Sequence, residues 1–141
     1  MISIDFYSEE ISNLPISSLV NTLPELISNE GCSLGEITLI FCTDDELLEI
    51  NKTHLSHDYY TDIITFNYNE GSCLSGDLFI STDRVSDNAT QLNVSFFEEL
   101  HRVCYHGVLH LVGYNDKTEE ESMVMRTKEN FYLTKLFHVK Q

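Results

Sequence analysis

The sequence has few basic residues, and this shortage limits the ways in which the protein could bind a polyanion. Eight lysines and arginines stand against 23 aspartates and glutamates, which gives a formal net charge of -15. Proteins that bind nucleic acid usually carry a basic patch that attracts phosphate groups. A polyanionic substrate would therefore have to be held by a metal ion and a few local cations, or be presented by a partner protein.

Long apolar runs and paired cysteines are also missing. No segment approaches the roughly 18 apolar residues that a membrane span requires, and the first ten residues contain no basic region typical of a secretion signal. The four cysteines form no C-x-x-C pair, and two of them, Cys42 and Cys104, fall in apolar segments. These absences predict a cytoplasmic protein without disulfides and without contact with a membrane.

The composition is otherwise that of a globular protein, with 42% apolar and 22% charged residues among 141. This length suits one domain, residues 1–141, with a single core. Hydrophobic periodicity and capping residues predict four strands and about five helices. The fold class predicted is therefore α+β, with a mixed four-stranded sheet. The strands are expected at residues 2–6, 37–42, 63–68 and 77–80, and the helices at 15–29, 43–50, 85–92, 95–113 and from 118 onward.

The residues with the clearest chemistry lie near the end of the helix expected at 95–113. His106 and His110 are one helical turn apart beside the apolar stripe, so both imidazoles can reach one ion. The helix is expected to end at Gly113, which allows Asp116 to turn back as a third ligand. Two histidines and one carboxylate leave a coordination position for water, which zinc activates near neutral pH. The spacing of the histidines alone is weak evidence, because such a pair also arises by chance on helix surfaces.

The segment His106-Gly-Val-Leu-His-Leu-Val-Gly-Tyr-Asn-Asp116 resembles the H-G-x-L-H-L-x-G-Y-D-H signature of the YbeY family, the bacterial rRNA maturation endoribonucleases. Two upstream blocks resemble the same family in the same order. They are residues 51–66, with Asp58, Thr61, Asp62 and Phe66 in register, and residues 75–81, similar to its L-G-D-I-x-I-S strand. Together the blocks cover about residues 36–117.

This resemblance implies a zincin-like fold, one zinc ion per chain and cleavage of single-stranded RNA. It also implies a role in maturing the 3′ end of 16S rRNA and in ribosome quality control. The partners would be precursor rRNA and ribosomal or ribosome-assembly proteins in the cytoplasm, and DNA is not expected. The ligand set of two histidines and an aspartate also suits manganese, iron or nickel.

Two positions depart from the family pattern. Asp116 stands where the third ligand is usually histidine, and carboxylate oxygen is an accepted zinc ligand. Leu55 stands where many relatives carry an arginine, so another cation is needed at the substrate phosphate. Arg102, four residues before His106, is the candidate for a phosphate clamp, with Lys117 as a second possibility. The alternative for Arg102 is an ion pair with Glu98 or Glu99.

The proton acceptor is less clearly marked in the sequence. Gly107 occupies the position at which H-E-x-x-H peptidases keep their general base, which argues against a peptidase of that type. Asp62 and Asp77 are candidates for the base or for hydrogen-bond acceptors of the histidines. Alternatively, Asp62 orients a loop and Asp77 starts a strand. Two other functions stay open at this point: a metallohydrolase of peptides or small esters, and a ribosome-assembly module with a structural metal.

Overall fold

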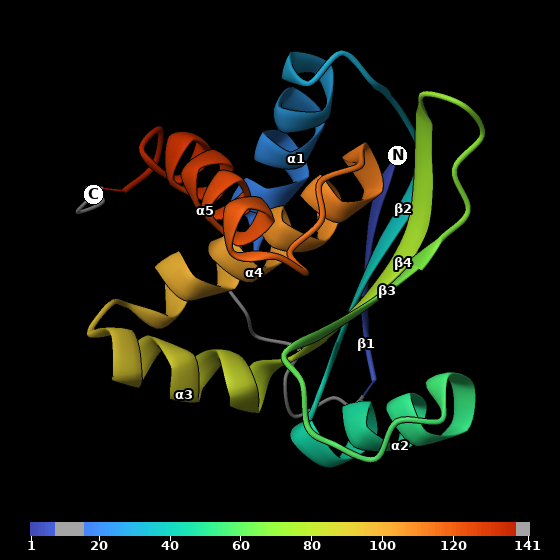
Figure 1. Ribbon diagram of the computed structural model, residues 1–141, viewed down its shortest axis with the longest axis vertical. Helices are drawn as coiled ribbons and strands as arrows, with labels where there is room; N and C mark the ends of the chain where they lie inside the picture. The colour runs from blue at the N-terminus through green and yellow to red at the C-terminus, as the bar shows by residue number, and fades with distance from the viewer. Residues whose placement is uncertain (8–15, 138–141) are drawn as a thin grey trace.

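The computed structural model describes residues 1–7 and 16–137, and it contains four strands and five helices in these ranges. The sheet order is β1-β2-β4-β3, with β1, β2 and β4 parallel and β3 antiparallel to β4 (Figure 1). The predicted α+β class with a mixed four-stranded sheet is thus confirmed. In chain order the elements are β1 (Ile2–Phe6), α1 (Ser17–Asn29), β2 (Ser33–Cys42), α2 (Asp44–Leu55), β3 (Ile63–Asn67), β4 (Cys73–Ser81), α3 (Thr82–Leu92), α4 (Phe96–Val112) and α5 (Glu119–Leu133).

The strands and helices differ from the predicted ranges mainly at their ends. β2 and β4 each begin four residues earlier than predicted, because Ser33 pairs with Cys73 and Leu34 with Leu74 outside the apolar runs. α2 has the predicted capping box at Thr43 but continues to Leu55, and it ends where Ser56 adopts a left-handed conformation. α1 runs through Pro24, and its predicted start at Pro15 lies outside the described residues.

The two faces of the sheet are covered unequally. One face packs against α1 and α4, and α5 joins this main core by packing on α4. Strand β2 contributes Ile37, Leu39 and Phe41 to it. The other face packs against α2 in a smaller cluster that contains Leu47, Ile50 and Ile64. Alternate residues of each strand point to opposite faces, which explains why Leu78 and Phe79 of β4 belong to different clusters.

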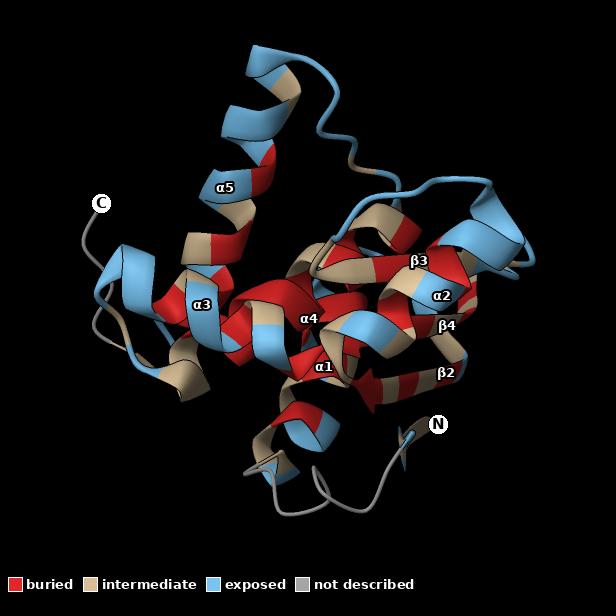
Figure 2. Ribbon diagram, turned by 90° about the horizontal axis from the view of Figure 1, so that it is seen from below, coloured by how far each residue is buried: buried red, intermediate tan, exposed pale blue. Residues whose placement is uncertain are grey.

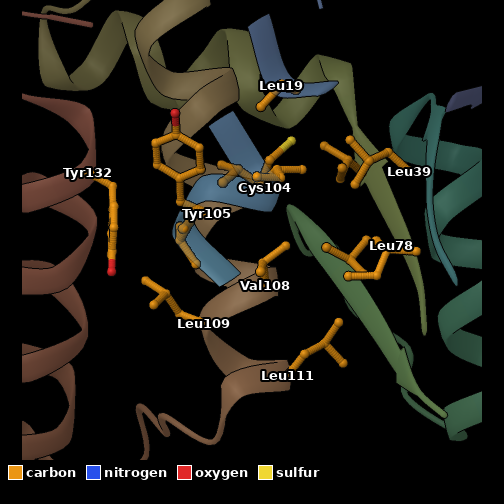
Figure 3. Packing of buried hydrophobic residues seen from close by; sticks show 14 of the residues in the cluster. Leu19, Leu39, Leu78, Cys104, Tyr105, Val108, Leu109, Leu111 and Tyr132 are labelled. Carbon is orange, nitrogen blue, oxygen red and sulfur yellow. The ribbon is translucent and has the colours of Figure 1, made fainter. Parts of the chain in front are cut away.

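Helix α4 lies at the centre of the main core. It contacts α1, α3, α5 and two strands, and it is buried along most of its length while α2 and α5 expose one side (Figure 2). Figure 3 shows Cys104 and Val108 of α4 on the side of the sheet residues Leu39 and Leu78, with Leu109 on the side of Tyr132 from α5. Helix α4, which carries both histidines, is therefore held in place by contacts on several of its sides.

Gly107 permits the close approach of α4 to the sheet. A Cβ atom at this position would lie 2.6 Å from Cδ1 of Ile63 and 2.7 Å from Cδ2 of Leu78. A glutamate in this position would collide with the sheet. No described helix is both long and apolar enough to cross a membrane.

Candidate metal centre

The end of α4 directs the chain back toward its own histidines. Ser95 caps the start of the helix by accepting a hydrogen bond from the backbone N–H of Glu98 at 3.0 Å. Gly113 ends the helix with a φ of +127°, a backbone conformation that favours glycine. The backbone N–H groups of Gly113 and Tyr114 both donate to the carbonyl of Leu109. This turn brings Asp116 to the side of the helix that carries the imidazoles.

Each imidazole has a hydrogen-bond acceptor at its Nδ1 atom. Nδ1 of His110 lies 2.9 Å from the backbone carbonyl of Tyr114, and Nδ1 of His106 lies 2.7 Å from Oε2 of Glu129 in α5. Because a carbonyl and a carboxylate can only accept, both Nδ1 atoms carry the proton. When the ring is neutral, the Nε2 atom of each imidazole therefore presents a lone pair.

The three ligand atoms have the spacing of a zinc site. Nε2 of His106 lies 3.0 Å from Nε2 of His110 and 3.2 Å from Oδ2 of Asp116. Nε2 of His110 lies 3.6 Å from Oδ2 of Asp116. Ligands at the corners of a tetrahedron stand about 3.4 Å apart when each is about 2.0 to 2.1 Å from zinc. The observed distances surround this value, so the three side chains could hold one ion without large movement.

The charges at this point also favour a cation. Two lone pairs and one carboxylate converge, an arrangement that is unfavourable unless a positive charge lies between them. Burial lowers the pKa of His106, but the hydrogen bond that His106 donates to Glu129 and the charges of Glu129 and Asp116 outweigh burial and raise the pKa above its usual value. The same negative field that favours a proton here would stabilise a metal ion.

Glu129 is a residue that the sequence reasoning missed. It is 4% exposed, and besides His106 it contacts two arginines, Arg102 at 3.1 Å and Arg126 at 3.6 Å. A signal was available, because Glu129 falls on the same helical stripe as the buried Met125 and Tyr132 of α5. A carboxylate on a buried helical stripe requires a hydrogen-bond donor or a cation as its partner. Such a buried carboxylate can therefore indicate a functional position.

The structure places Arg102 among carboxylates. Its guanidinium group pairs with Glu129 and lies 3.8 Å from Oε1 of Glu99, the ion pair considered as the alternative from the sequence. Burial raises the pKa of Glu99 to about 7, even though the charge of Arg102 acts to lower it. Since the side chain of Arg102 is 11% exposed, these carboxylates already offset much of the charge that it could offer to a substrate phosphate.

The two candidate aspartates lie in different places. Asp62 lines both cavities that flank the ligand group, and burial raises the pKa of its carboxyl. Asp77 lines neither cavity, because it alternates along β4 with Gly76 and Leu78, the residues that meet α4. The structure thus brings Asp62 to the three ligands and leaves Asp77 on the other face of the sheet.

The ligand group lies between two cavities. One, of about 400 Å³, is bounded by α3, α4 and α5 and contains Glu99, Arg102 and Glu129. The other, of about 590 Å³, is bounded by β3 and the segment after α2 and contains Leu55 and Lys117. His106 and Asp116 line both cavities, so an extended ligand could cross the ligand group from one cavity to the other.

Comparison with known proteins gives one consistent result. The profile of the family described as Endoribonuclease YbeY matches residues 3–137. A protein of that name from Flavobacterium psychrophilum is 50% identical over 125 residues, covering 89% of each chain. One from Phocaeicola vulgatus is 46% identical over 130 residues, covering 92% of this chain and 94% of the relative. A Thermotoga maritima protein solved in solution superimposes with a TM-score of 0.69 and 28% identity, covering 94% of this chain and 87% of that one.

Proposed function

The chain belongs to the YbeY endoribonuclease family, and from this premise we propose that it hydrolyses single-stranded RNA with one zinc ion bound by His106, His110 and Asp116. The observation that supports this most strongly is the convergence of three ligand atoms within 3.6 Å of one another, between two cavities. A bound divalent ion would supply Lewis-acid chemistry, polarising a phosphoryl oxygen and lowering the pKa of a water molecule.

The protein's own residues would perform the remaining steps. Tyr114 and Glu129 hold the two imidazoles in the tautomer that binds a metal. Asp62 faces both cavities, where its carboxylate would accept the proton of the attacking water. Arg102 would act by holding Glu129 in place, and Lys117 is the cation placed to contact a substrate phosphate.

Nothing in the site favours the hydrolysis of peptides. Gly107 stands where an H-E-x-x-H peptidase carries its general base, and any side chain at this position would have to displace the side chains of Ile63 and Leu78. A purely structural metal is also not favoured, because two cavities open onto the ligand group.

The experiment that tests the proposal is a cleavage assay on a single-stranded oligoribonucleotide. Zinc-loaded protein is expected to cut the strand internally, whereas metal-stripped protein and the His110→Ala variant are expected to be inactive. The Glu119→Gln variant, altered at an exposed position of α5, is the control for a general effect of substitution. Equal cleavage by the metal-stripped protein would contradict a metal-dependent mechanism.

In the cell, we propose precursor 16S rRNA as the substrate, with ribosomal or ribosome-assembly proteins in the cytoplasm as partners. Family membership supports this, and so does the net charge of -15, since an acidic protein gains from a partner that presents the RNA. The test is the 3′ end of 16S rRNA in cells that lack the gene. Unprocessed ends are expected to disappear with the wild-type chain and to persist with His110→Ala.

A further inference from the structure

Two aromatic rings are stacked on the surface beside the metal ligands. The rings of His57 and Tyr59 have centroids 5.1 Å apart and planes inclined by 21°, and the hydroxyl of Tyr59 lies 3.0 Å from Nδ1 of His57. Tyr59 is 56% exposed. Both residues line the cavity of about 590 Å³ that also contains His106, His110 and Asp116. An exposed aromatic pair next to the ligand group has no role in the core.

The segment that carries the pair is fixed to α2. The side-chain amide of Asn51, which is 2% exposed, donates a hydrogen bond to the backbone carbonyl of Tyr59 at 2.9 Å. The backbone N–H of His57 donates to the carbonyl of Asn51 at 3.1 Å. One buried asparagine thus anchors both aromatic residues, so little conformational freedom is lost when a ligand stacks on them.

We propose that His57 and Tyr59 form a stacking platform for one unpaired base of the RNA, next to the phosphodiester held at His106, His110 and Asp116. This inference rests on the proposed function and names the subsite that the substrate would occupy. The cavity volume lies within the roughly 300 to 1,000 Å³ of small-molecule sites, which suits a nucleotide. Lys117 is the one lysine or arginine among the described residues that line the cavity, and it would contact a phosphate.

The charged side chains that line the two cavities also favour the cavity beside β3 as the site of the base. The cavity between α3, α4 and α5 is lined by the carboxylates of Asp62, Glu99, Asp116 and Glu129, and both of its arginines already pair with Glu129. Among the residues that the structure describes, the cavity beside β3 has only Asp62 and Asp116 as carboxylates. A base with its phosphates would therefore meet less repulsion beside His57 and Tyr59, and it would find there an aromatic surface that the other cavity lacks.

A stacking platform would explain a preference for single strands without a preference for sequence. Every base has an aromatic face, whereas a base within a duplex is already stacked and paired and cannot reach the platform. Selectivity would then depend on whether the RNA is single-stranded or paired, and not on hydrogen bonds to base edges. No basic patch would be required, which agrees with the charge of the chain.

Equilibrium binding by the full-length protein tests the platform. A short single-stranded oligoribonucleotide carrying 2-aminopurine would be titrated into metal-stripped wild-type protein, Tyr59→Ala, Tyr59→Phe and Tyr68→Ala. We expect the wild type to quench the fluorescence of the base. Tyr59→Ala should lose the quenching and bind about 5- to 150-fold more weakly, the range for one base–aromatic stack. Tyr59→Phe should bind within about threefold of the wild type, because phenylalanine can still stack.

Tyr68→Ala is the matched control, since Tyr68 is 58% exposed and lines neither cavity beside the ligands. Quenching and affinity unchanged in Tyr59→Ala would overturn the platform, while cleavage by the zinc-loaded wild type would leave the proposed function standing. Quenching that is lost in Tyr59→Ala, with no cleavage by the zinc-loaded wild type, would support the platform and contradict the proposed function. Absence of RNA binding by the metal-stripped wild type would overturn the platform, and the cleavage assay with zinc-loaded protein would decide the proposed function separately.

Discussion

The orientation of two imidazole rings decides whether this metal centre can form. His106 and His110 each present Nε2 to the centre because Nδ1 donates to an acceptor on another segment, Glu129 for one ring and Tyr114 for the other. Glu129 is in turn held by Arg102, a buried cation. A series of contacts thus runs from Arg102 of α4 through Glu129 of α5 to His106, a candidate metal ligand, and disturbing it should weaken metal binding.

Glu129→Gln is expected to lower the affinity for zinc by about 10- to 100-fold, the usual effect of removing the hydrogen-bond partner of a ligating histidine. The neutral amide accepts more weakly and leaves Arg102 without its full counter-charge. Competition with a chelating dye measures the affinity. Glu119→Gln removes the same charge from an exposed position of the same helix and should bind zinc as the wild type does. Equal affinities in all three proteins would show that Glu129 does not position His106.

Asp62→Asn is expected to reduce kcat for RNA cleavage by about 10²- to 10⁴-fold, the range for loss of a general base. Zinc affinity should stay close to the wild-type value, because Asp62 is not one of the three ligands. Asp77→Asn provides the comparison, since its side chain belongs to the strand positions that face away from α4. A larger loss of kcat in Asp77→Asn than in Asp62→Asn would contradict the placement of the base at Asp62.

The grouping of the three candidate metal ligands could be predicted from the sequence, but the contacts of the groups that support them could not. His106, His110 and Asp116 lie within eleven residues, so helix geometry and one glycine were enough to bring them together. Glu129 acts across a contact between two helices: the buried stripe of α5 marks the face on which it lies, but no local pattern shows that it meets Arg102 and His106 of α4. Arg102 was predicted to contact a phosphate because of its position on the helix. Its burial beside Glu129 could not be seen in the sequence.

The position of α5 on α4 depends on a small polar cluster around Glu30, at the end of α1. The carboxylate accepts hydrogen bonds from the hydroxyl groups of Tyr132 and Tyr114 and pairs with Lys128, and its side chain is 6% exposed. This cluster joins α1, α5 and the segment that follows α4. Burial would raise the pKa of the Glu30 carboxyl, but the hydrogen bonds from Tyr132, Tyr114 and Lys128 outweigh burial and hold the pKa below its usual value.

Glu30→Gln is expected to reduce the free energy of unfolding by about 2 kcal/mol at pH 7, because hydrogen bonds to a charged group are lost. The pKa of the Glu30 carboxyl is lower in the folded protein than in the unfolded chain, where it is about 4.3. The carboxylate therefore stabilises the protein fully above about pH 4.3, and it loses this effect as the pH falls through its pKa in the folded protein. The difference between the two proteins should therefore shrink below about pH 4. Urea unfolding at several pH values measures it.

Glu36→Gln is the matched control for Glu30→Gln, because Glu36 is exposed in β2. It should unfold like the wild type at every pH. A stability difference between wild type and Glu30→Gln that stays constant from pH 7 to pH 3 would contradict the role given to the carboxylate.

At the scale of helices and strands, periodicity and capping predicted which elements exist, and pairing between strands determined where they end. The capping box at Thr43 and the cap at Ser95 begin their helices as predicted. The early starts of β2 and β4 were missed, because each strand is extended by the backbone of the other and not by its own apolar residues. The sequence could not reveal such a reciprocal effect.

For the whole molecule, the net charge of -15 limits how RNA can be bound. Affinity should come from stacking and from the metal, with few lysines or arginines at phosphate groups. For single strands the logarithm of the binding constant falls with the logarithm of salt concentration with a slope of about -0.7 per phosphate contact. With Lys117 as the main contact, we expect RNA binding by the metal-stripped chain to weaken only about three- to sevenfold between 50 and 200 mM salt, for one or two contacts.

Fluorescence anisotropy of a labelled oligoribonucleotide at several salt concentrations measures this dependence. Lys117→Gln should make the slope shallower still, while Lys135→Gln, altered at a residue that lines neither cavity beside the ligands, should leave it unchanged. A slope equivalent to four or more phosphate contacts would mean that the RNA follows a basic surface other than the cavity beside β3.

Nε2 of His106, Nε2 of His110 and a carboxylate oxygen of Asp116 are proposed to share one ion. Nitrogen NMR of the histidine side chains tests this arrangement most directly. During titration of the metal-stripped protein with zinc, the Nε2 signals of His106 and His110 should shift together and stop at one equivalent, with both Nδ1 atoms still protonated. The buried His101, bonded to Ser18 and Phe97, should not respond. Zinc binding through Nδ1, or a shift of only one of the two histidines, would contradict the account.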